Sequence, residues 1–374
     1  MRLLFLADTH LGFDYPFRAR IHRRRRGEDF FANYARALEP ALKGEVDAVV
    51  HGGDMFFRSK VPARLVDMAF GPLKEIADKG IDVFIVPGNH ERSRIPFRIL
   101  SLHPHIHIFD VPRTFVFEKQ GFRLGLAGFP YWRDGIRSQF PLVLEETGWK
   151  GQLTDCDGML LCVHHCFEGA TVGPGNYTFR YNDDVIRLKD IPKEFLAVLS
   201  GHIHRYQVLT KDLKGRSIKT PILYPGSIER TSFAEKDEPK GYLKVELRRD
   251  EKIVNAEMVN EGMGYEKRKN AKMYLFGMEK AGQLSLSWEF IRLPARPMVR
   301  VDIPAHGLTR DALKEFIRKT LEGLDPESVV KLHIKGPAKE EASILLRAES
   351  LRALSPSQMN VSLRFQEKPS SFNK

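Results

Sequence analysis

Five short polar motifs in this chain carry side chains that could bind divalent metal ions. Each offers carboxylate, imidazole or amide groups, which suit borderline divalent cations. In chain order the motifs are Asp8-Thr9-His10, Gly53-Asp54, Gly88-Asn89-His90, His164 and Gly201-His202-Ile203-His204. Two metals about 3.5–4 Å apart need a shared ligand, and one carboxylate can bridge them. We choose Asp54 as the bridge, and the set indicates a site for two divalent metal ions.

Taken singly, each motif has a plainer explanation. A lone histidine beside a strand is usually a packed or solvent-facing residue, and a Gly-Asn-His turn can be needed only for its backbone shape. The conjunction of all five motifs, each after an apolar strand, is what favours a metal site. His164 and His165 are adjacent, so only one should be a ligand. We expect His164, the first residue after its strand, and give His165 a supporting or solvent-facing role.

Short apolar strands are expected to deliver these motifs. The runs that precede them span residues 2–7, 47–50, 81–86, 159–163 and 196–199. Helix-period segments at 28–42 and 62–79 separate the early strands. Strands alternating with helices predict an α/β layered fold, in which polar residues after the strands converge on one rim. The metal-binding side chains should therefore meet there.

A second, smaller α/β unit is expected to start near Pro294 to Pro297. Its strands are predicted at 298–303, 329–334 and 361–365, and its helices at 309–324 and 338–354. Thr309 is a plausible N-cap for the first of these helices. The predicted division is a first domain at 1–250 that carries the metal motifs, a connector at 251–287, a second domain at 288–366 and a tail at 367–374.

The bulk composition limits the classes of protein to consider. A chain of 374 residues is long enough for two domains, and it has neither a run of about 18 apolar residues nor a signal peptide. Its three cysteines are odd in number and clustered, so a reducing, cytoplasmic compartment is expected. Cys162 and Cys166 are expected in the core, since no second cysteine pair could complete a zinc site. The formal net charge of +11 favours a polyanionic partner but does not identify it.

The ordered motifs resemble the signature D-x-H, G-D, G-N-H, H, G-H-x-H of the calcineurin-like metallophosphoesterases. This resemblance implies a four-layer α/β/β/α sandwich with a smaller C-terminal α/β capping domain. It also implies in-line attack of a metal-activated water on a phosphodiester, with His90 protonating the leaving oxygen. The implied ligand sets, which share Asp54, are Asp8, His10 and His204 for one metal and Asn89, His164 and His202 for the other.

Three further segments resemble the SbcD-type DNA double-strand-break repair nucleases of that superfamily. They are Tyr224-Pro-Gly-Ser-Ile-Glu-Arg230 with the following Phe233 and Glu238-Pro-Lys-Gly-Tyr242, then Arg292-Leu-Pro-Ala-Arg-Pro297, and the basic stretch from Arg18 to Arg26. The resemblance covers most of 1–250 and 288–366. It implies a DNA nuclease with two divalent ions, preferably Mn²⁺, acting as an exonuclease, a single-strand endonuclease or both in DNA break repair.

Basic residues near the metal motifs are the predicted DNA contacts, because they could bind phosphates along a backbone. They are Arg20, Arg23, Arg24, Arg25, Arg26, Lys60, Arg92 and Arg94. A solvated charge run is the plainer alternative for the arginines. Phe129, Tyr131 and Trp132 could stack on bases or serve the core equally well.

Two departures from the family pattern lie within the metal motifs. Glu91 stands where the family commonly has aspartate, and Phe57 where it often has histidine. Phe57 leaves open the balance between exonuclease and endonuclease action, and with it the polarity of cleavage. The connector at 252–283 is also longer than the family needs.

The resemblance further implies a homodimer and an SMC-like ATPase partner, bound through a helical segment beyond the capping domain. Only residues 367–374 follow the last predicted strand, and this stretch is too short for a helical pair. Two alternative functions stay open: a phosphodiesterase for small nucleotides or other phosphate esters, and a DNA-binding scaffold with a degenerate site. A small substrate would need neither the arginine run nor the second domain.

Overall fold

The computed structural model describes residues 1–14, 25–91, 102–250, 271–277, 283–336 and 348–365. The chain divides into two compact units. The first consists of Met1–Phe13 and Asp29–Pro294, and the second of Asp14–Glu28 and Ala295–Lys374. No helix among the described residues is long and apolar enough to cross a membrane.

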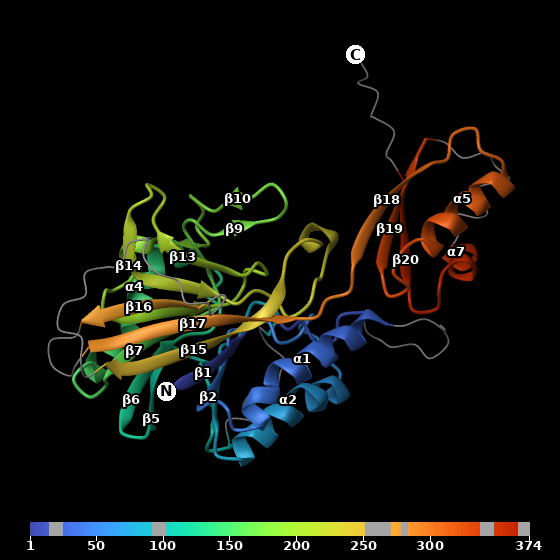
Figure 1. The fold of residues 1–374 in the computed structure, drawn as a ribbon. Helices are drawn as coiled ribbons and strands as arrows, with labels where there is room; N and C mark the ends of the chain where they lie inside the picture. The colour runs from blue at the N-terminus through green and yellow to red at the C-terminus, as the bar shows by residue number, and fades with distance from the viewer. Residues whose placement is uncertain (15–24, 92–101, 251–270, 278–282, 337–347, 366–374) are drawn as a thin grey trace. The chain divides into compact units, whose positions relative to one another are not determined.

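Two large mixed sheets dominate the first unit (Figure 1). The first sheet has the order β16-β17-β15-β1-β2-β3-β4. Its parallel strands are β1 (Arg2–Leu6), β2 (Ala48–His51), β3 (Asp82–Ile85) and β4 (Ile106–Ile108). Its antiparallel strands are β15 (Lys240–Asp250), β16 (Ala271–Gly277) and β17 (Gln283–Leu293).

The second sheet has the order β13-β14-β12-β7-β6-β5. Its parallel strands are β6 (Phe122–Gly128), β7 (Gly158–Val163), β12 (Phe195–Ser200) and β14 (Ser217–Tyr224), and its antiparallel edges are β5 (Arg113–Lys119) and β13 (Gln207–Lys211). The short elements of this unit are β8 (Cys166–Phe167), β9 (Thr171–Val172), β10 (Tyr177–Thr178), β11 (Val185–Ile186), and the 3₁₀ helices η1 (Trp149–Gln152), η2 (Leu188–Asp190) and η3 (Phe233–Glu235).

The two sheets pack face to face and share one apolar core. Alternate residues point inward along each strand, so Phe5 of β1 and Val50 of β2 join Leu126 of β6 and Leu160 of β7 in a single buried cluster. The parallel strands are buried on both faces, which explains why their sequences read as continuous apolar runs.

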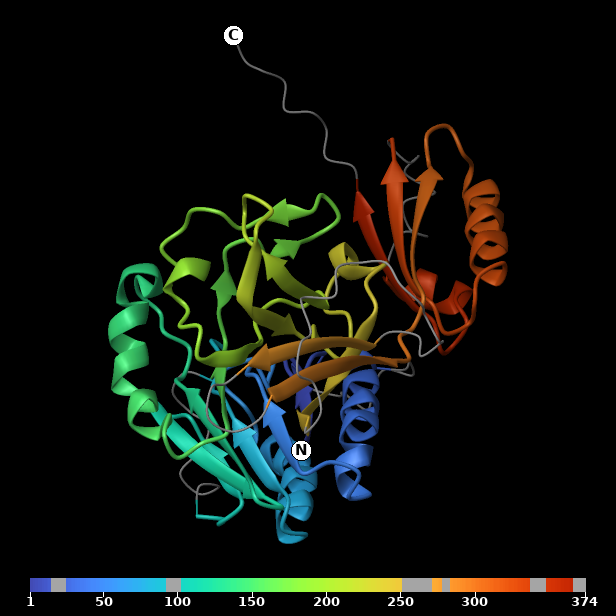
Figure 2. The same cartoon turned by 60° about the vertical axis from the view of Figure 1, so that its left-hand side comes forward.

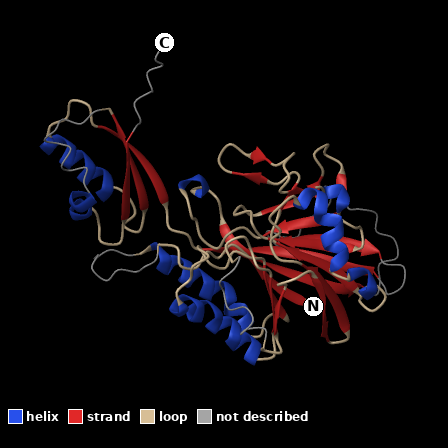
Figure 3. Cartoon of the chain, turned by 180° about the vertical axis from the view of Figure 1, so that it is seen from behind, coloured by secondary structure: helices blue, strands red, loops and turns tan. Residues whose placement is uncertain are grey.

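Helices cover the outer faces of both sheets. On one side lie α1 (Arg26–Leu42) and α2 (Ala63–Asp78), which are joined by a 2.9 Å hydrogen bond from the Tyr34 hydroxyl to the Ala69 carbonyl. On the other side, α4 (Ile136–Glu146) packs against the second sheet through residues such as Phe140. Figures 2 and 3 show the strands between these two groups of helices. The predicted four-layer α/β/β/α sandwich is therefore confirmed.

The second unit has a three-stranded parallel sheet in the order β18-β19-β20. Its elements are β18 (Met298–Pro304), α5 (Arg310–Glu322), β19 (Val329–Lys335), α7 (Ala348–Leu354) and β20 (Asn360–Phe365). Thr309 caps α5, since its hydroxyl accepts a hydrogen bond from the Ala312 amide at 3.3 Å. These elements follow the predicted β-α-β-α-β order, although residues 338–347 of the second predicted helix lie outside the described residues.

The segment predicted as an elaborated connector at 251–287 contributes strands to the first sheet. β17 pairs along its whole length with β15, and β16 pairs with β17. Leu284, Leu286 and Trp288 alternate along β17, and all three are buried in the core between the sheets. This alternation was the available signal for a strand. Residues 251–270 lie outside the described part of the chain.

Candidate metal centre

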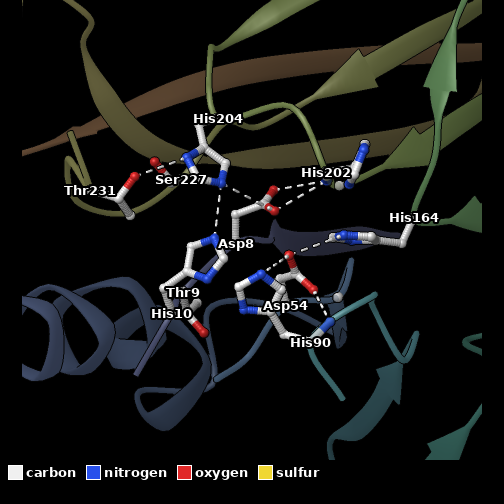
Figure 4. Close-up of polar contacts among 12 residues, drawn as sticks. Asp8, Thr9, His10, Asp54, His90, His164, His202, His204, Ser227 and Thr231 are labelled. Carbon is white, nitrogen blue, oxygen red and sulfur yellow. Dashed lines mark hydrogen bonds and ion pairs between the residues drawn. The ribbon is translucent and has the colours of Figure 1, made fainter. Parts of the chain in front are cut away.

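All eight predicted site residues lie just beyond the carboxyl ends of parallel strands. Figure 4 shows them apart from Asn89. The first sheet supplies Asp8 and His10 after β1, Asp54 after β2, and Asn89 and His90 after β3; the second supplies His164 after β7, and His202 and His204 after β12. Parallel strands with a common direction bring these ends to the same edge. The structure therefore brings together motifs that are spread over nearly 200 positions of sequence.

The loops that present these side chains have an unusual backbone. Asp8, His10, Asp54 and His202 have φ angles of 50°, 42°, 51° and 80°, in the left-handed region. Each such residue costs on the order of 1–3 kcal/mol unless its surroundings impose the conformation. Among the described non-glycine residues only three others share this feature. Strain concentrated in four predicted ligands indicates loops shaped for a site rather than for stability.

Asp8, His10 and His204 form the first group of metal-binding atoms. Their ligand atoms lie within 4.8 Å of one another. The Nε2 atoms of His10 and His204 are only 2.9 Å apart, and Nε2 of His204 lies 3.9 Å from Oδ1 of Asp8. Burial raises the pKa of the Asp8 carboxyl to about 6. Two imidazole nitrogens and a carboxylate that converge in this way suit a cation, which would satisfy all three.

Asn89, His164 and His202 form the second group. Oδ1 of Asn89 lies 3.1 Å from Nε2 of His164 and 3.0 Å from Nδ1 of His202. His164 donates its Nδ1 proton to the Gly52 carbonyl at 2.7 Å, so in the neutral ring the lone pair is on Nε2. That lone pair faces the Asn89 oxygen and Oδ2 of Asp54 at 3.4 Å. These acceptors need a positive charge between them, and a divalent cation fits.

The pKa values of His164 and Asp54 indicate the same need for positive charge. Burial lowers the pKa of His164, but the charge and hydrogen bond of Asp54, together with the charge of Asp8 and the hydrogen bond to Gly52, outweigh burial and raise it to about 9. Burial likewise raises the pKa of Asp54, but the charge and hydrogen bond of His164, together with the charges of His10 and His90, outweigh burial and lower it. Without a metal, a proton on His164 thus balances the buried carboxylate.

Asp54 occupies the middle of the site. It belongs to one group with Asp8 and His164 and to another with His10 and His90. Its Oδ1 accepts a hydrogen bond from the His90 amide at 2.9 Å. The G-N-H loop packs so closely on Asp54 that a Cβ on Gly88 would lie 2.3 Å from Oδ1 and 2.4 Å from the Asp54 amide nitrogen. The glycine of this motif is therefore required by packing.

His90 is more open than the residues around it. Its side chain is 31% exposed, against 4% for Asp54, and its Nε2 lies 3.9 Å from Oδ2 of that carboxylate. Its Nδ1 has no hydrogen-bond partner among the described residues. A partly exposed imidazole beside the metal-binding residues suits a residue that contacts the substrate.

His165 is buried, and its imidazole contacts two neighbouring aromatic residues. Its Nε2 accepts a hydrogen bond from the Trp132 amide at 3.0 Å, and the Tyr131 ring stacks on it with centroids 4.9 Å apart. Of the two roles predicted for His165, the supporting one fits. Phe129 is completely buried in the core, as are Cys162 in β7 and, almost completely, Cys166.

Two residues that the sequence motifs did not reveal, His51 and Glu235, support the predicted ligands and their loops through hydrogen bonds. The Gly53 amide donates to Nδ1 of His51, and Nε2 of His51 lies 3.1 Å from the Thr9 hydroxyl, which donates to the Met55 carbonyl. This chain of hydrogen bonds joins the D-x-H and G-D loops. Glu235 similarly contacts His204, with its Oε1 3.3 Å from Nδ1. A polar residue adjacent to a motif was the only signal for His51, and nothing in the sequence distinguished Glu235.

Glu91, noted above as a departure from the family pattern, is a buried acceptor for three backbone amides. Its Oε2 accepts from Asp54 at 2.9 Å and Gly88 at 2.7 Å, and its Oε1 accepts from Phe56 at 2.9 Å. Burial, and then the charge of Asp54, raise its pKa to about 8. One carboxyl therefore ties the G-D loop to the G-N-H loop.

We expect Glu91→Ala to destabilise the fold strongly. The substitution leaves three buried amides without an acceptor, and each costs about 1–3 kcal/mol, so the free energy of unfolding should fall by at least about 3 kcal/mol. Urea unfolding of the metal-free protein measures this. Exposed Glu118 on β5 supplies the matched control, Glu118→Ala, which should change stability little. Equal effects of the two substitutions would contradict the role given to Glu91.

The predicted DNA contacts are only partly within the described residues. Arg25 is held by Asp14, with an ion pair of 3.0 Å and a 2.6 Å hydrogen bond to its carbonyl, while Arg26 begins α1. Lys60 is exposed. The predicted contacts that lie outside the described residues are Arg20, Arg23, Arg24, Arg92 and Arg94.

Phe57, the other departure from the family pattern, borders the site. Its ring centroid lies 6.0 Å from that of His10 and 6.2 Å from that of His90, and it meets the Phe13 ring edge-on at 4.9 Å. Where the family often has a polar histidine, this chain therefore presents an apolar ring beside His10, a predicted ligand, and His90, the predicted acid.

Known proteins similar to this chain include DNA repair proteins and a phosphatase. The DNA double-strand break repair protein Mre11 of Haloferax volcanii is 30% identical over 260 residues, which cover 67% of this chain and 50% of that protein. The protein of the same name from Methanosarcina acetivorans is 28% identical over 255 residues, covering 65% and 36%. A solved dimetal phosphatase from Danio rerio has 14% identity and a TM-score of 0.39, covering 65% of this chain and 91% of that one.

The chain spans half or less of the length of these two curated relatives. The profile of the calcineurin-like phosphoesterases matches residues 1–206, which is more than half of the chain and contains all five metal motifs. This match and the convergent ligand groups indicate divalent metal ions as cofactors. The chain therefore belongs to the calcineurin-like phosphoesterase family.

Proposed function

We propose that this protein is a manganese-dependent DNA nuclease that hydrolyses phosphodiester bonds in DNA break repair. The observation that carries the proposal is a pair of ligand groups with Asp54 between them, in a chain similar to proteins named for double-strand break repair. The mixed carboxylate, imidazole and amide ligands suit Mn²⁺. Because fold alone does not determine function, the proposal rests on these side chains.

The proposed metal ligands are those of the two groups described above. Asp8, His10 and His204 would hold one ion, Asn89, His164 and His202 the other, and Asp54 both. Bound ions of this kind polarise phosphoryl oxygens and activate water. His90 would contact the scissile phosphate and donate a proton to the leaving oxygen, and its partial exposure beside Asp54 supports that role.

DNA is the proposed substrate, rather than a small phosphodiester. Support comes from the net charge of +11, from exposed Lys60 near the G-D loop, and from a second α/β unit that a small substrate would not require. The second unit would serve DNA binding. Exonuclease and endonuclease action, a homodimer and an SMC-like ATPase partner belong to the same proposal through the family resemblance.

The nuclease assay uses the purified protein with labelled duplex ends, labelled single strands and a chromogenic phosphodiester. We expect DNA cleavage with Mn²⁺, its complete loss on chelation with EDTA, and its recovery when Mn²⁺ is added back, because the proposed ions activate the attacking water. Cleavage of the small ester alone would favour the rival phosphodiesterase. DNA binding without hydrolysis of any substrate would favour a scaffold with a degenerate site.

We expect Lys60→Ala to weaken DNA binding for all sequences alike. A lysine that contacts phosphate releases a counterion, so its loss should reduce the slope of log affinity against log salt concentration by about 1. The matched control is Lys43→Ala, which removes an exposed lysine paired with Glu39 near the end of α1. Unchanged slopes for both variants would remove Lys60 from the DNA interface.

A further inference from the structure

A buried ion pair lies behind His204, on the side away from its metal-facing Nε2. Lys240, the first residue of β15, is completely buried, and its Nζ donates to Oε2 of Glu235 at 2.6 Å. A buried ammonium group is costly unless a carboxylate compensates it. Neither residue takes part in the proposed reaction, so the pair requires another explanation.

The ion pair closes a ring of hydrogen bonds around His204. Lys240 also donates to the His204 carbonyl at 2.9 Å, while Oε1 of Glu235 lies 3.3 Å from Nδ1 of the same histidine. Thr231 donates its hydroxyl proton to that Oε1 at 2.6 Å and so orients the carboxylate. The main chain and the imidazole of one predicted ligand are thus held by one ion pair.

The turn before η3 supports the same residue. The Ser227 amide donates to the His204 carbonyl at 3.1 Å. Gly226 approaches so closely that a Cβ there would lie 2.8 Å from that carbonyl oxygen. The Tyr-Pro-Gly-Ser segment therefore serves to position His204 and needs no contact with substrate to explain it.

In His164 and His10, the ring nitrogen that points away from the metal position is held differently. Nδ1 of His164 donates to a neutral backbone carbonyl, and Nδ1 of His10 has no hydrogen-bond partner among the described residues. A carboxylate that accepts the outer N–H of a metal-binding histidine fixes its tautomer and makes the inner nitrogen a stronger ligand. Within the described residues His204 has this arrangement and His10 and His164 do not.

We propose that Glu235, held in place by Lys240, is a positioning residue that sets the metal affinity of the position formed by Asp8, His10 and His204. This inference rests on the two-ion site of the proposed function and adds an asymmetry between its two positions. The Glu235 carboxylate strengthens one ligand of one position. Its loss should therefore weaken that position and leave the other intact.

Mn²⁺ titration of the full chain, followed by calorimetry and by electron paramagnetic resonance, tests the proposal. The unsubstituted protein should bind two ions and show the signal of an exchange-coupled pair. Glu235→Gln should retain one tight ion, lower the affinity for the other about 10–100-fold, and lose the coupled signal. The control is Glu238→Gln, since Glu238 contacts Lys240 at 3.5 Å but pairs with Arg205 rather than His204.

Glu235→Asp covers the case in which the glutamine variant does not fold. It keeps a negative charge opposite Lys240 and withdraws the carboxylate from His204 by one methylene, so the same position should weaken. Two tight ions in a folded Glu235 variant would overturn this inference alone, as would an equal loss in Glu238→Gln. Absence of a coupled pair in the unsubstituted protein would overturn the proposed metal site and this inference with it.

Discussion

Replacing Asp54 with asparagine should abolish phosphodiester hydrolysis. Substituting a residue that merely supports a metal ligand lowers activity by up to about 100-fold. Loss of the bridging ligand should therefore lower the rate by more than about 100-fold. The amide oxygen can still accept the hydrogen bond from the His90 amide. The amide nitrogen, however, would replace the oxygen that faces Nε2 of His164. The shape of the loop is therefore kept while the capacity to bridge two ions is lost, and rates measured with Mn²⁺ report that loss.

Asp82→Asn is the matched control for this prediction. Asp82 begins β3 of the same sheet, and its Oδ1 likewise accepts hydrogen bonds from two histidines, His107 at 2.6 Å and His105 at 3.3 Å. It contributes to none of the metal-binding groups among the described residues. Its substitution should leave hydrolysis unchanged. An Asp54→Asn protein that cleaves DNA as fast as this control would contradict a bridging role.

Replacing His90 with alanine should slow DNA cleavage by about 10²–10⁴-fold, the contribution of a general acid, while Mn²⁺ binding persists. The His90 side chain is partly exposed, so its removal should cost the fold little. Single-turnover rates on a labelled strand, measured at saturating Mn²⁺, give the size of the effect.

The leaving group distinguishes an acid from a metal ligand. Nitrophenolate leaves without protonation, so His90→Ala should cleave a nitrophenyl phosphodiester nearly as fast as the unsubstituted protein does. Asp54→Asn should be inactive on both substrates. Because Asp54, His10 and His90 also form a group that could bind a metal, weaker Mn²⁺ binding by His90→Ala would instead identify His90 as a ligand.

The ends of the strands were predictable because two local signals coincide there. The run at residues 3–6 is apolar since both faces of its strand are buried there, and its polar continuation at Asp8 marks the rim. The layered fold follows from the alternation of these runs with helices. Each motif could thus be located from its own neighbourhood.

Features that depend on distant partners could not be predicted in this way. The contact of Glu235 with His204 joins segments 31 residues apart, and the three amides held by Glu91 come partly from a loop 35 to 37 residues away. The pairing of Arg25 with Asp14 likewise withdraws one arginine of the run from the free charge that the sequence suggested. Hydrogen bonds between loops leave no periodic pattern in a sequence.

Strand β17 shows the opposite case, in which a local pattern is present but is too short to define a strand by itself. Leu284, Leu286 and Trp288 alternate as a half-buried strand should. Charge runs precede this short alternation in the sequence. Three alternating positions are too few to predict a strand, and the strand forms because β17 pairs with β15.

Anomalous diffraction from crystals grown with Mn²⁺ tests the two-ion site most directly. We predict two peaks about 3.5–4 Å apart, one beside Asp8, His10 and His204, the other beside Asn89, His164 and His202, with Asp54 touching both. A single peak, or a peak bound by His90 in place of one of these ligands, would contradict the proposed site.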